Sequence, residues 1–425
     1  MKVSQNWLKE LVDINSTPEV LAEKLSIGGF EVESLKDTSL QVKGVLLGNV
    51  LSVEKHPNST KLSVCQVDIG NKNILQIVCG AKNIKSDIHV YVATVGSYLS
   101  SIDLSIKKSE IRGVSSEGMI CSLEELGLDS NTDGIEIIDP LTIKDHKLGT
   151  EASKILGLND HIFDLAITAN RPDGMSVIGI AREISALLQT KLTLPPEHEI
   201  INLNAFKTDK LCQETINSEC IYTISYIDNV NGKQTSPKWI KERLEKSDIK
   251  SKNLIVDITN YILLEQGQPL HAFDLEKLSQ LIGRDVLPED FGVRKAKNGE
   301  FLTALDGIKY ELNENISIVV CSDKPVAIAG VIGGLETAVT EQTSSIILEG
   351  AVFNPSIIRK SSREVGIRTE SSSRFEKGIS YRNTLNSLSR AFYLLNKYFK
   401  ESKPTIYSSR IINQEKKSIK LRRER

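Results

Sequence analysis

The sequence predicts a multidomain α+β protein, in which a small β-barrel is inserted into a helical N-terminal domain and a mixed α/β domain follows. Three observations predict this fold class. Two helical stretches at the N-terminus give way to a run of short β-branched segments, and helical periodicity returns near residue 150. A long stretch of mixed periodicity then continues to about residue 399. At 425 residues the chain is also too long for one ordinary core.

Composition narrows the class of protein. Hydrophobic residues at 40% and charged residues at 25% are ordinary for a globular protein, and no apolar run is long enough to cross a membrane, so we expect a cytoplasmic protein with no membrane partner. A net charge of -2 argues against nucleic-acid binding through the whole surface, so any RNA contact must be confined to patches. The six cysteines form no CxxC pair, and we therefore predict no metal site.

The first element is helical. Residues 1–40 carry two helical signals, and the second begins at Thr17, a good N-cap, followed by Pro18, which suits the first helical position. The helical period returns in a segment that contains the NRPD turn at 170–173. We expect residues 1–40 and 150–192 to form one N-terminal helical domain. The intervening barrel would then be an insertion, which is tolerated when its two ends lie close together.

The second element is the barrel, predicted over residues 41–149. Its signals are four short runs rich in β-branched residues, VLLGNVLSV, LSVCQVDIG, ILQIVCG and HVYVATVGSYL, separated by HPNS, GNKN and AKNIKSD. Five or six short strands at this spacing are typical of a small closed barrel.

The third element follows a break at Leu194 to Glu197 and is predicted over residues 205–400. Its last helix carries apolar residues at steps of three and four, a stripe typical of core packing. The segment 405–425 then ends in EKKSIKLRRER, with six basic residues in eleven. We interpret it as the start of a truncated further domain, with an RNA-contacting arm as the alternative.

Three ordered motifs mark the barrel: HPNSTKL at 56–62, IVCGAKNI at 77–84 and IRGVSSEGMICSLEELGL at 111–128. They resemble the OB-type tRNA-binding module that occurs in synthetases and in free-standing tRNA-associated proteins. His56 stands alone beside a proline and is interpreted as a turn residue rather than a metal ligand. Phosphate contacts in such a module would come from cations, for which the candidates are Lys61, Lys82, Lys107, Lys108 and Arg112.

Five further motifs lie in order in the third element. They are LIVDITNYILLEQGQPLHAFD at 254–274, TALDG at 303–307, AIAGVIGG at 327–334, LEGAVFNP at 348–355 and RTESSSRFEKG at 368–378. Together with NRPD, they resemble the bacterial-type phenylalanyl-tRNA synthetase β-subunit family, in its N-terminal portion. In that family this domain edits, hydrolysing tyrosine that has been mischarged onto the tRNA for phenylalanine.

The resemblance implies an editing pocket. Glu349 is suggestive even without it, because a carboxylate inside the apolar run ILEGAV must be paired or functional. Ser371 stands where family members often have Ala, and Lys250 stands where they commonly have Arg. By alignment with the family, the pocket residues are His271, Glu349, Thr369, Gly333, Ser371 and Lys250.

The chemistry expected of this pocket follows from discrimination. Tyr differs from Phe by one hydroxyl, and an apolar synthetic pocket rejects an added hydroxyl by only about a hundredfold. A second pocket with a buried carboxylate gains more, because the phenol satisfies that group and Phe leaves it unpaired, a difference of roughly 1 to 3 kcal/mol. The sequence holds no GxSxG-type nucleophile motif, so we expect hydrolysis by a positioned water, assisted by the tRNA ribose.

The resemblance also implies an assembly. A β subunit pairs with a catalytic α subunit in an α2β2 heterotetramer that charges tRNA with phenylalanine, using ATP and Mg²⁺. No ATP-binding motif is present here, so we expect no catalytic residue for aminoacylation, and neither cofactor bound by residues of this chain. Two alternatives remain open: a free-standing trans-editing hydrolase, and a non-catalytic tRNA-binding scaffold.

Overall fold

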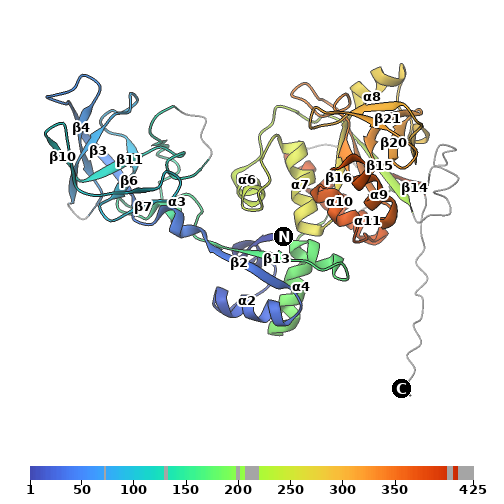
Figure 1. The fold of residues 1–425 in the computed structure, drawn as a ribbon, viewed down its shortest axis with the longest axis horizontal. Coiled ribbons are helices and arrows are strands. Elements are labelled where there is room, and N and C mark those ends of the chain that lie inside the picture. The colour runs from blue at the N-terminus through green and yellow to red at the C-terminus, as the bar shows by residue number, and fades with distance from the viewer. Residues whose placement is uncertain (71–72, 129–132, 198–201, 206–219, 400–404, 410–425) are drawn as a thin grey trace. The chain divides into compact units, whose positions relative to one another are not determined.

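The computed structural model describes the chain except for residues 71–72, 129–132, 198–201, 206–219, 400–404 and 410–425. Two compact units are present (Figure 1). Unit 1 comprises Met1–Ser34 and Phe163–Arg425, and unit 2 comprises Leu35–Ile162. Unit 2 is therefore an insertion in the sequence of unit 1. Most of the basic segment 405–425 lies outside the described residues.

The N-terminal part of unit 1 contains both predicted helices. Thr17 caps the second by accepting a hydrogen bond from the Val20 amide, and Pro18 is its first residue. A three-stranded sheet of order β1-β13-β2 was not predicted, because its strands are short and β13 lies where helical periodicity was expected. The elements are β1 (Lys2–Ser4), α1 (Gln5–Lys9), α2 (Pro18–Ile27), β2 (Glu31–Asp37), β13 (His161–Ala166), η2 (Pro172–Met175) and α4 (Val177–Leu188).

Unit 2 is built on a curled, half-barrel sheet of order β11-β6-β3-β4-β5, with β12 beside β6. The four predicted β-branched runs form its strands. Two apolar clusters cover its opposite faces, because β6 contributes Tyr91 and Ala93 to one and Val90 and Val92 to the other. The longer strands are β3 (Val45–Lys55), β4 (Ser63–Asp68), β5 (Ile74–Cys79), β6 (His89–Thr94) and β11 (Gly118–Cys121). Shorter elements are η1 (Thr38–Val42), β7 (Tyr98–Leu99), β8 (Leu104–Ser105), β9 (Ser109–Ile111), β10 (Val114–Ser116), β12 (Ile137–Ile138) and α3 (Ala152–Ile155).

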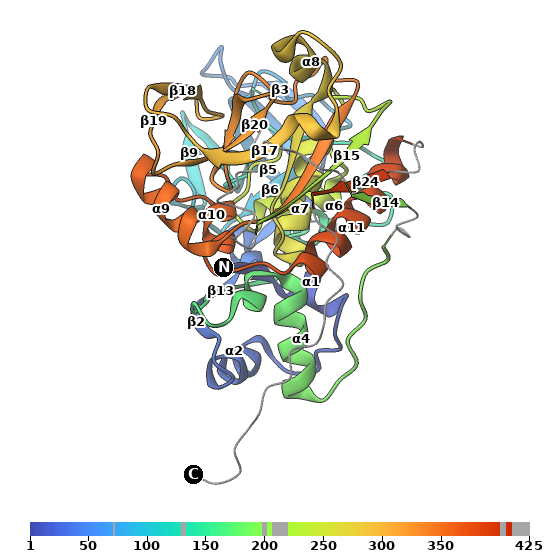
Figure 2. The ribbon, with the colours of Figure 1, turned by 90° about the vertical axis from the view of Figure 1, so that its right-hand side faces the viewer.

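A five-stranded sheet of order β14-β24-β15-β23-β16 forms the centre of the C-terminal part of unit 1. Helices α7 and α11 pack together and against this sheet (Figure 2). A buried ion pair between Glu265 and Arg390 joins the two helices at 2.9 Å. The elements are β14 (Asn202–Ala205), β15 (Ile221–Ile227), α6 (Lys238–Glu245), α7 (Leu254–Gln266), β16 (Leu270–Asp274), α8 (Leu275–Ile282), β23 (Ile346–Val352), α11 (Tyr381–Phe399) and β24 (Thr405–Ser408).

A second sheet, of order β17-β20-β21-β22, shares a core with the first. Tyr222 and Phe273 from the first sheet belong to the same buried cluster as Phe291 and Ile318 from the second. The elements are η3 (Pro288–Asp290), β17 (Phe291–Lys295), β18 (Glu300–Thr303), β19 (Lys309–Leu312), β20 (Ser317–Cys321), β21 (Lys324–Ile328), β22 (Ile332–Gly333), α9 (Pro355–Val365) and α10 (Glu370–Phe375).

A buried contact joins α10 to the turn before α4, within the segment Phe163–Arg425 of unit 1. Arg374 in α10 is only 1% exposed, and its Nε donates to the Met175 carbonyl at 3.0 Å. Its Nη1 donates to the Glu370 carboxylate at 2.6 Å. Burial lowers the pKa of Arg374, so the Met175 and Glu370 oxygens are what stabilise its charge.

None of the helices within the described residues has the length and apolar content that crossing a lipid bilayer requires. Of the five cysteines that the structure describes, four are buried and Cys220 is half-buried. Cys212 lies outside the described residues.

Candidate functional site

The register of the central sheet places two predicted site residues directly opposite each other. His271 on β16 pairs with Glu349 on the antiparallel strand β23. Opposite residues in such a ladder point to the same face, with their Cβ atoms about 5 Å apart. Phe273 and Tyr222 are on this face and belong to the core shared with the second sheet. The imidazole and the carboxylate therefore meet between the two sheets.

Glu349 is a buried carboxylate with a phenol as its partner. Its Oε2 accepts a hydrogen bond from the Tyr222 hydroxyl at 2.6 Å, and its Oε1 has no hydrogen-bond partner among the described residues. Burial raises the pKa of Glu349 to about 7, against the opposing effect of the Tyr222 hydrogen bond. Burial and the neighbouring carboxylate together raise the pKa of Tyr222 well above its ordinary value. One carboxylate oxygen is thus available to a ligand hydroxyl.

His271 is held neutral beside this carboxylate. Burial lowers the pKa of the imidazole to about 4. The buried Nε2 has no hydrogen-bond partner in the described part of the chain. A Cβ atom built on Gly333 of β22 would lie 2.5 Å from the His271 Cε1 and 2.7 Å from Nε2. Only a glycine leaves the imidazole in this position.

The raised pKa of Glu349 predicts a pH dependence of stability. A folded-state pKa of about 7, against an ordinary value of 4.5, means that the folded chain holds this proton more tightly than the unfolded chain does. Stability is therefore lost as the pH rises from about 4.5 through 7, by about 3 kcal/mol from this group. Glu349→Gln removes the titration. Urea unfolding of both proteins at pH 5 and pH 8 measures this difference. Between pH 5 and pH 8 the free energy of unfolding should fall by more in the wild type than in the variant, and an equal fall in both would contradict the raised pKa of Glu349.

Of the other predicted pocket residues, Thr369 is linked to β22, whereas Ser371 and Lys250 make no contact with this pair that the structure records. The Thr369 hydroxyl caps α10, accepting from the Ser372 amide at 3.0 Å, and donates to the Val331 carbonyl at 2.9 Å, just before β22. Ser371 is half-buried in the first turn of α10. Lys250 is exposed between α6 and α7 and makes no hydrogen bond or ion pair with the described residues. The structure thus joins His271, Glu349 and Gly333 directly and Thr369 through Val331.

Two residues at the site were not singled out from the sequence. Tyr222 is the hydrogen-bond partner of Glu349. The alternating sequence IYTISYI predicts a strand, but it does not indicate which other strand lies beside it. Leu305 borders Gly333, whose carbonyl accepts from the Leu305 amide at 3.0 Å, and a Cβ on Gly333 would lie 3.2 Å from the Leu305 Cδ1. Leu305 belongs to the TALDG motif, so its motif was recognised but its position was not.

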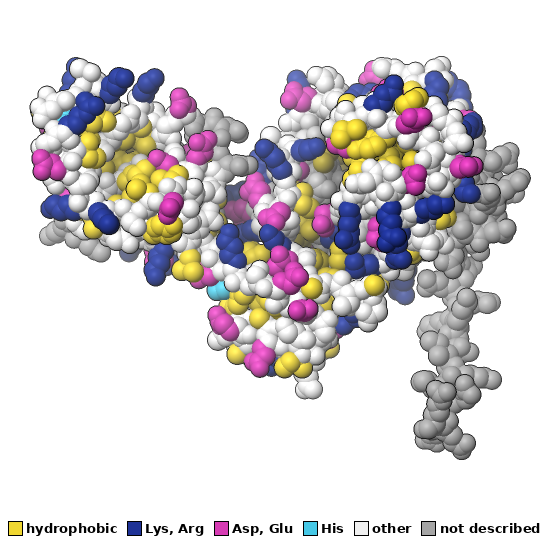
Figure 3. Space-filling model, viewed as in Figure 1, with side chains coloured by type: hydrophobic (Ala, Val, Ile, Leu, Met, Phe, Trp, Pro, Cys, Tyr) yellow, Lys and Arg dark blue, Asp and Glu magenta, His cyan; other side chains and the backbone are white. Residues whose placement is uncertain are grey.

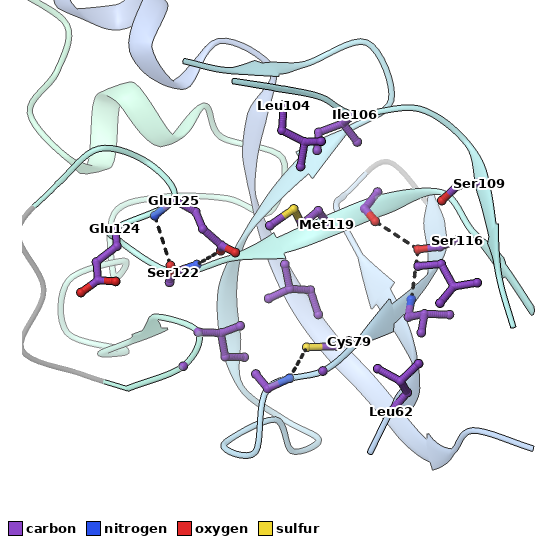
Figure 4. Close-up of a pocket in the computed structure, with 18 of the residues that line it drawn as sticks. Leu62, Cys79, Leu104, Ile106, Ser109, Ser116, Met119, Ser122, Glu124 and Glu125 are labelled. Carbon is purple, nitrogen blue, oxygen red and sulfur yellow. Dashed lines mark hydrogen bonds between the residues drawn. The ribbon is translucent and has the colours of Figure 1, made fainter. Parts of the chain in front are cut away.

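Unit 2 contains a large groove of about 980 Å³. Figure 4 shows Leu104 and Ile106 on one side of it, Cys79 and Leu62 on the opposite side and Met119 between them. Glu124 and Glu125 lie at one end, where Glu125 accepts from the Ser122 amide at 2.7 Å. The groove is therefore apolar in the middle and acidic at one end, which suits a neutral or cationic ligand better than a phosphate.

The predicted cations of unit 2 lie at its surface without forming one cluster with uncompensated charge. Lys61, Lys82 and Lys107 are exposed, and Lys107 borders the groove. Lys108 forms an ion pair with Glu117 at 2.6 Å, and the Arg112 Nη1 donates to the Ser59 hydroxyl at 3.3 Å. Residues 35–162 contain thirteen Lys and Arg against sixteen Asp and Glu, so the unit is acidic overall.

Two motif residues have the structural roles expected of them. The His56 ring accepts from the Asn58 amide at 3.0 Å and contacts the Ile111 carbonyl at 3.0 Å, which confirms a turn residue. Arg171 of NRPD makes two hydrogen bonds to Asp173 and one to Glu183 at 2.8 Å. That network ties the turn to α4, as predicted. No group of three or more potential metal ligands occurs among the described residues.

Comparison with known proteins decides the family. Residues 219–400 match the model of the B3/4 domain, and residues 45–144 match that of a putative tRNA binding domain. The chain is 67% identical over all its 425 residues to the phenylalanine–tRNA ligase beta subunits of Prochlorococcus marinus strain MIT 9312 and of strain CCMP1986. Over its whole length it aligns with part of a phenylalanine–tRNA ligase beta subunit. The family resemblance predicted from the motifs is thereby confirmed.

The match has a defined extent. The alignment covers 100% of this chain and 52% of each of those two relatives, so the chain spans about half their length. Among solved structures, an N-terminal fragment of the phenylalanyl-tRNA synthetase beta subunit from Pyrococcus horikoshii is 15% identical, covering 59% of this chain and 63% of that one at a TM-score of 0.28.

Proposed function

We propose that this chain is the part of a phenylalanine–tRNA ligase beta subunit that binds tRNA and hydrolyses tyrosine mischarged onto the tRNA for phenylalanine. The observation that carries the proposal is the His271–Glu349 pair, opposite each other on β16 and β23 and bordered by Gly333. It lies inside the segment that matches the B3/4 domain.

The geometry supports discrimination at Glu349. The free Oε1 accepts the hydrogen bond of a substrate phenol, while phenylalanine leaves that oxygen buried and unpaired. Gly333 lets the imidazole lie directly against β22, and by resemblance to the family this glycine leaves room for the substrate ring. The ester is cleaved when water adds to its carbonyl carbon, the bond to the ribose oxygen breaks and that oxygen takes up a proton. The neutral His271, with an unpartnered Nε2, orients this water or the ribose hydroxyl.

The finer domain assignment belongs to this proposal. Residues 41–149, which lie within unit 2, are an OB-type tRNA-binding barrel inserted in a helical domain of 1–40 and 150–192, and 205–400 is the editing domain. Residues 405–425 begin a further domain. The barrel contacts tRNA through Lys61, Lys82, Lys107, Lys108 and Arg112.

The proposed assembly is an α2β2 heterotetramer in the cytoplasm, in which a separate α subunit makes the aminoacyl-adenylate. ATP and Mg²⁺ serve that subunit. The sequence of this chain contains no ATP-binding motif, and we assign neither cofactor to its residues.

The test uses the full chain with tyrosine or phenylalanine esterified to the tRNA for phenylalanine. We expect release of tyrosine and far slower release of phenylalanine. If neither ester is hydrolysed faster than in buffer, only the scaffold alternative remains. Co-expression with the α subunit separates the other two functions, because deacylation without a co-purifying complex would favour a free-standing hydrolase.

A further inference from the structure

A group of basic side chains lies on the outer side of α9 and around α10; we call it the α9 cationic face. Ile358, Ser361 and Ser362 are the buried residues of α9. The cationic residues point away from this core, and Figure 3 shows Lys and Arg side chains gathered over the region of α9 to α11. The face comprises Arg359, Lys360, Arg363, Arg368 and Lys377, of which all but the half-buried Lys377 are exposed.

These charges are not neutralised by neighbours. None of the five forms an ion pair within the described residues, whereas Arg374 between them is paired with Glu370. Arg359, Lys360 and Arg363 border one shallow hollow of about 290 Å³, together with Ser356 and Glu364. Glu364 accepts a hydrogen bond from the neutral Asn313 amide. The hollow is therefore a place where three cations converge around a space.

The mutual repulsion of the group is visible in its electrostatics. The pKa of Lys377 is lowered, first by burial and then by the positive charge of Arg368; the Glu376 carboxylate opposes this, and Arg374 and Arg359 lower the pKa further. Residues 355–378 contain six Lys and Arg against three Asp and Glu, the opposite balance to that of unit 2. An anionic ligand relieves such repulsion, and several phosphates on one chain relieve it at several cations at once.

The face is directly connected to the candidate site. Helix α9 ends at Gly366, where φ is +71°, and Arg368 immediately precedes Thr369, the N-cap of α10. Thr369 donates to the Val331 carbonyl, and two residues later Gly333 abuts the His271 ring. Within unit 1, a short series of contacts therefore leads from the cations to the His271–Glu349 pair.

We propose that the α9 cationic face binds backbone phosphates of the RNA whose 3′-terminal aminoacyl ester enters the His271–Glu349 site. The proposal deepens the editing function and rests on it for the identity of the RNA. The cations supply affinity and direction, while the buried carboxylate selects the amino acid. Lys and Arg that contact phosphates position an RNA without reading its sequence, so the face serves any tRNA whose 3′ end fits the pocket.

The test compares two triple variants of the full chain. Arg359→Gln, Lys360→Gln and Arg363→Gln together neutralise the hollow, and the matched control carries Lys9→Gln, Lys24→Gln and Lys191→Gln. Those three control lysines lie in the N-terminal part of unit 1 and have no ion pair among the described residues. The readout is the Kd for unacylated tRNA for phenylalanine as a function of salt. We expect the hollow variant to bind at least about tenfold more weakly. The slope of log Kd against log salt concentration should fall by about 2, because each lost phosphate contact contributes about 0.7 to 0.9 to that slope. The control should change little in both quantities.

A small substrate separates this inference from the proposed function. Hydrolysis of tyrosyl-adenosine, which lacks the RNA backbone, should be unchanged in the hollow variant. If the wild type hydrolyses nothing but the variant still loses tRNA affinity, the editing proposal fails and the phosphate surface stands. An unchanged Kd and salt slope, or an equal loss in the control, would overturn the proposed phosphate-binding surface.

Loss of binding to phosphatidylglycerol vesicles without loss of tRNA binding would assign the α9 cationic face to a membrane instead. The single variant Arg363→Gln gives a smaller loss in the same direction if the triple variant misfolds.

Discussion

Glu349→Ala is expected to reduce hydrolysis of the tyrosyl ester by about ten- to a hundredfold, with little effect on the residual rate for the phenylalanyl ester. The carboxylate is the group that a substrate phenol would meet, and a hydrogen bond to a buried charged group contributes about 1.5 to 3 kcal/mol. The substitution also leaves the Tyr222 hydroxyl, whose present acceptor is Glu349, without that partner. Single-turnover deacylation at saturating enzyme measures the effect without a contribution from tRNA affinity.

The control for this variant is Tyr222→Phe, which removes the internal phenol and keeps the carboxylate. The Tyr222 hydrogen bond lowers the pKa of Glu349, so its loss raises that pKa further. We expect the variant to retain discrimination in favour of tyrosine. Its rate of tyrosyl-ester hydrolysis should rise with the ionisation of Glu349, and therefore at a higher pH than in the wild type. If Tyr222→Phe loses discrimination as completely as Glu349→Ala, the recognising group is the pair and not the carboxylate alone.

Gly333→Ala is expected to abolish hydrolysis while leaving tRNA affinity within about twofold of wild type. The new methyl group would lie 2.5 Å from the His271 Cε1, too close for two non-bonded carbon atoms, so the imidazole or β22 must move. Overpacking of this kind costs typically about 1 to 3 kcal/mol. Thermal unfolding and deacylation, measured on the same preparation, report the strain and the loss of the pocket separately.

A double variant tests the geometry behind this expectation. His271→Ala removes the ring that the new methyl group meets, so Gly333→Ala in that background should recover most of its lost stability. A matched glycine elsewhere is Gly80, where a Cβ atom would lie 3.4 Å from the Leu62 Cδ2, an ordinary contact. Gly80→Ala should leave hydrolysis unchanged. Equal destabilisation by Gly333→Ala with and without the imidazole would contradict the predicted clash.

Local signals allowed much of the secondary structure to be predicted. Thr17 and Pro18 fixed the start of α2, and the β-branched runs of unit 2 became its strands, because these signals act within a few residues. The strand β13 escaped prediction, since it exists through pairing with β1 and β2, more than a hundred residues away in sequence. The hydrogen bond between Tyr222 and Glu349 also depends on the register between β15 and β23, which are distant in sequence. That register cannot be read from either segment alone.

The α9 cationic face was missed for a different reason. Lys and Arg at 359, 360 and 363 are an ordinary exposed helix surface by sequence. Their significance depends on Arg368 and Lys377, which the next turn and helix bring beside them, and on the lack of ion pairs to these cations among the described residues, although Glu364 borders the same hollow. By contrast, a carboxylate in an apolar run is anomalous wherever it occurs, so Glu349 is suggestive even without the family resemblance.

The buried guanidinium of Arg374 changes what counts as a domain in this chain. Its Nε is satisfied by a carbonyl that lies 199 residues earlier, at Met175, just before α4. The segment that matches the B3/4 family model starts at residue 219 and does not include that carbonyl. Cutting the gene at such a boundary would leave a cation in an apolar interior with one acceptor removed. The structural unit that holds Arg374 thus extends beyond the matched segment, and the helix that carries the Thr369 cap is bonded to a turn that lies outside both matched segments.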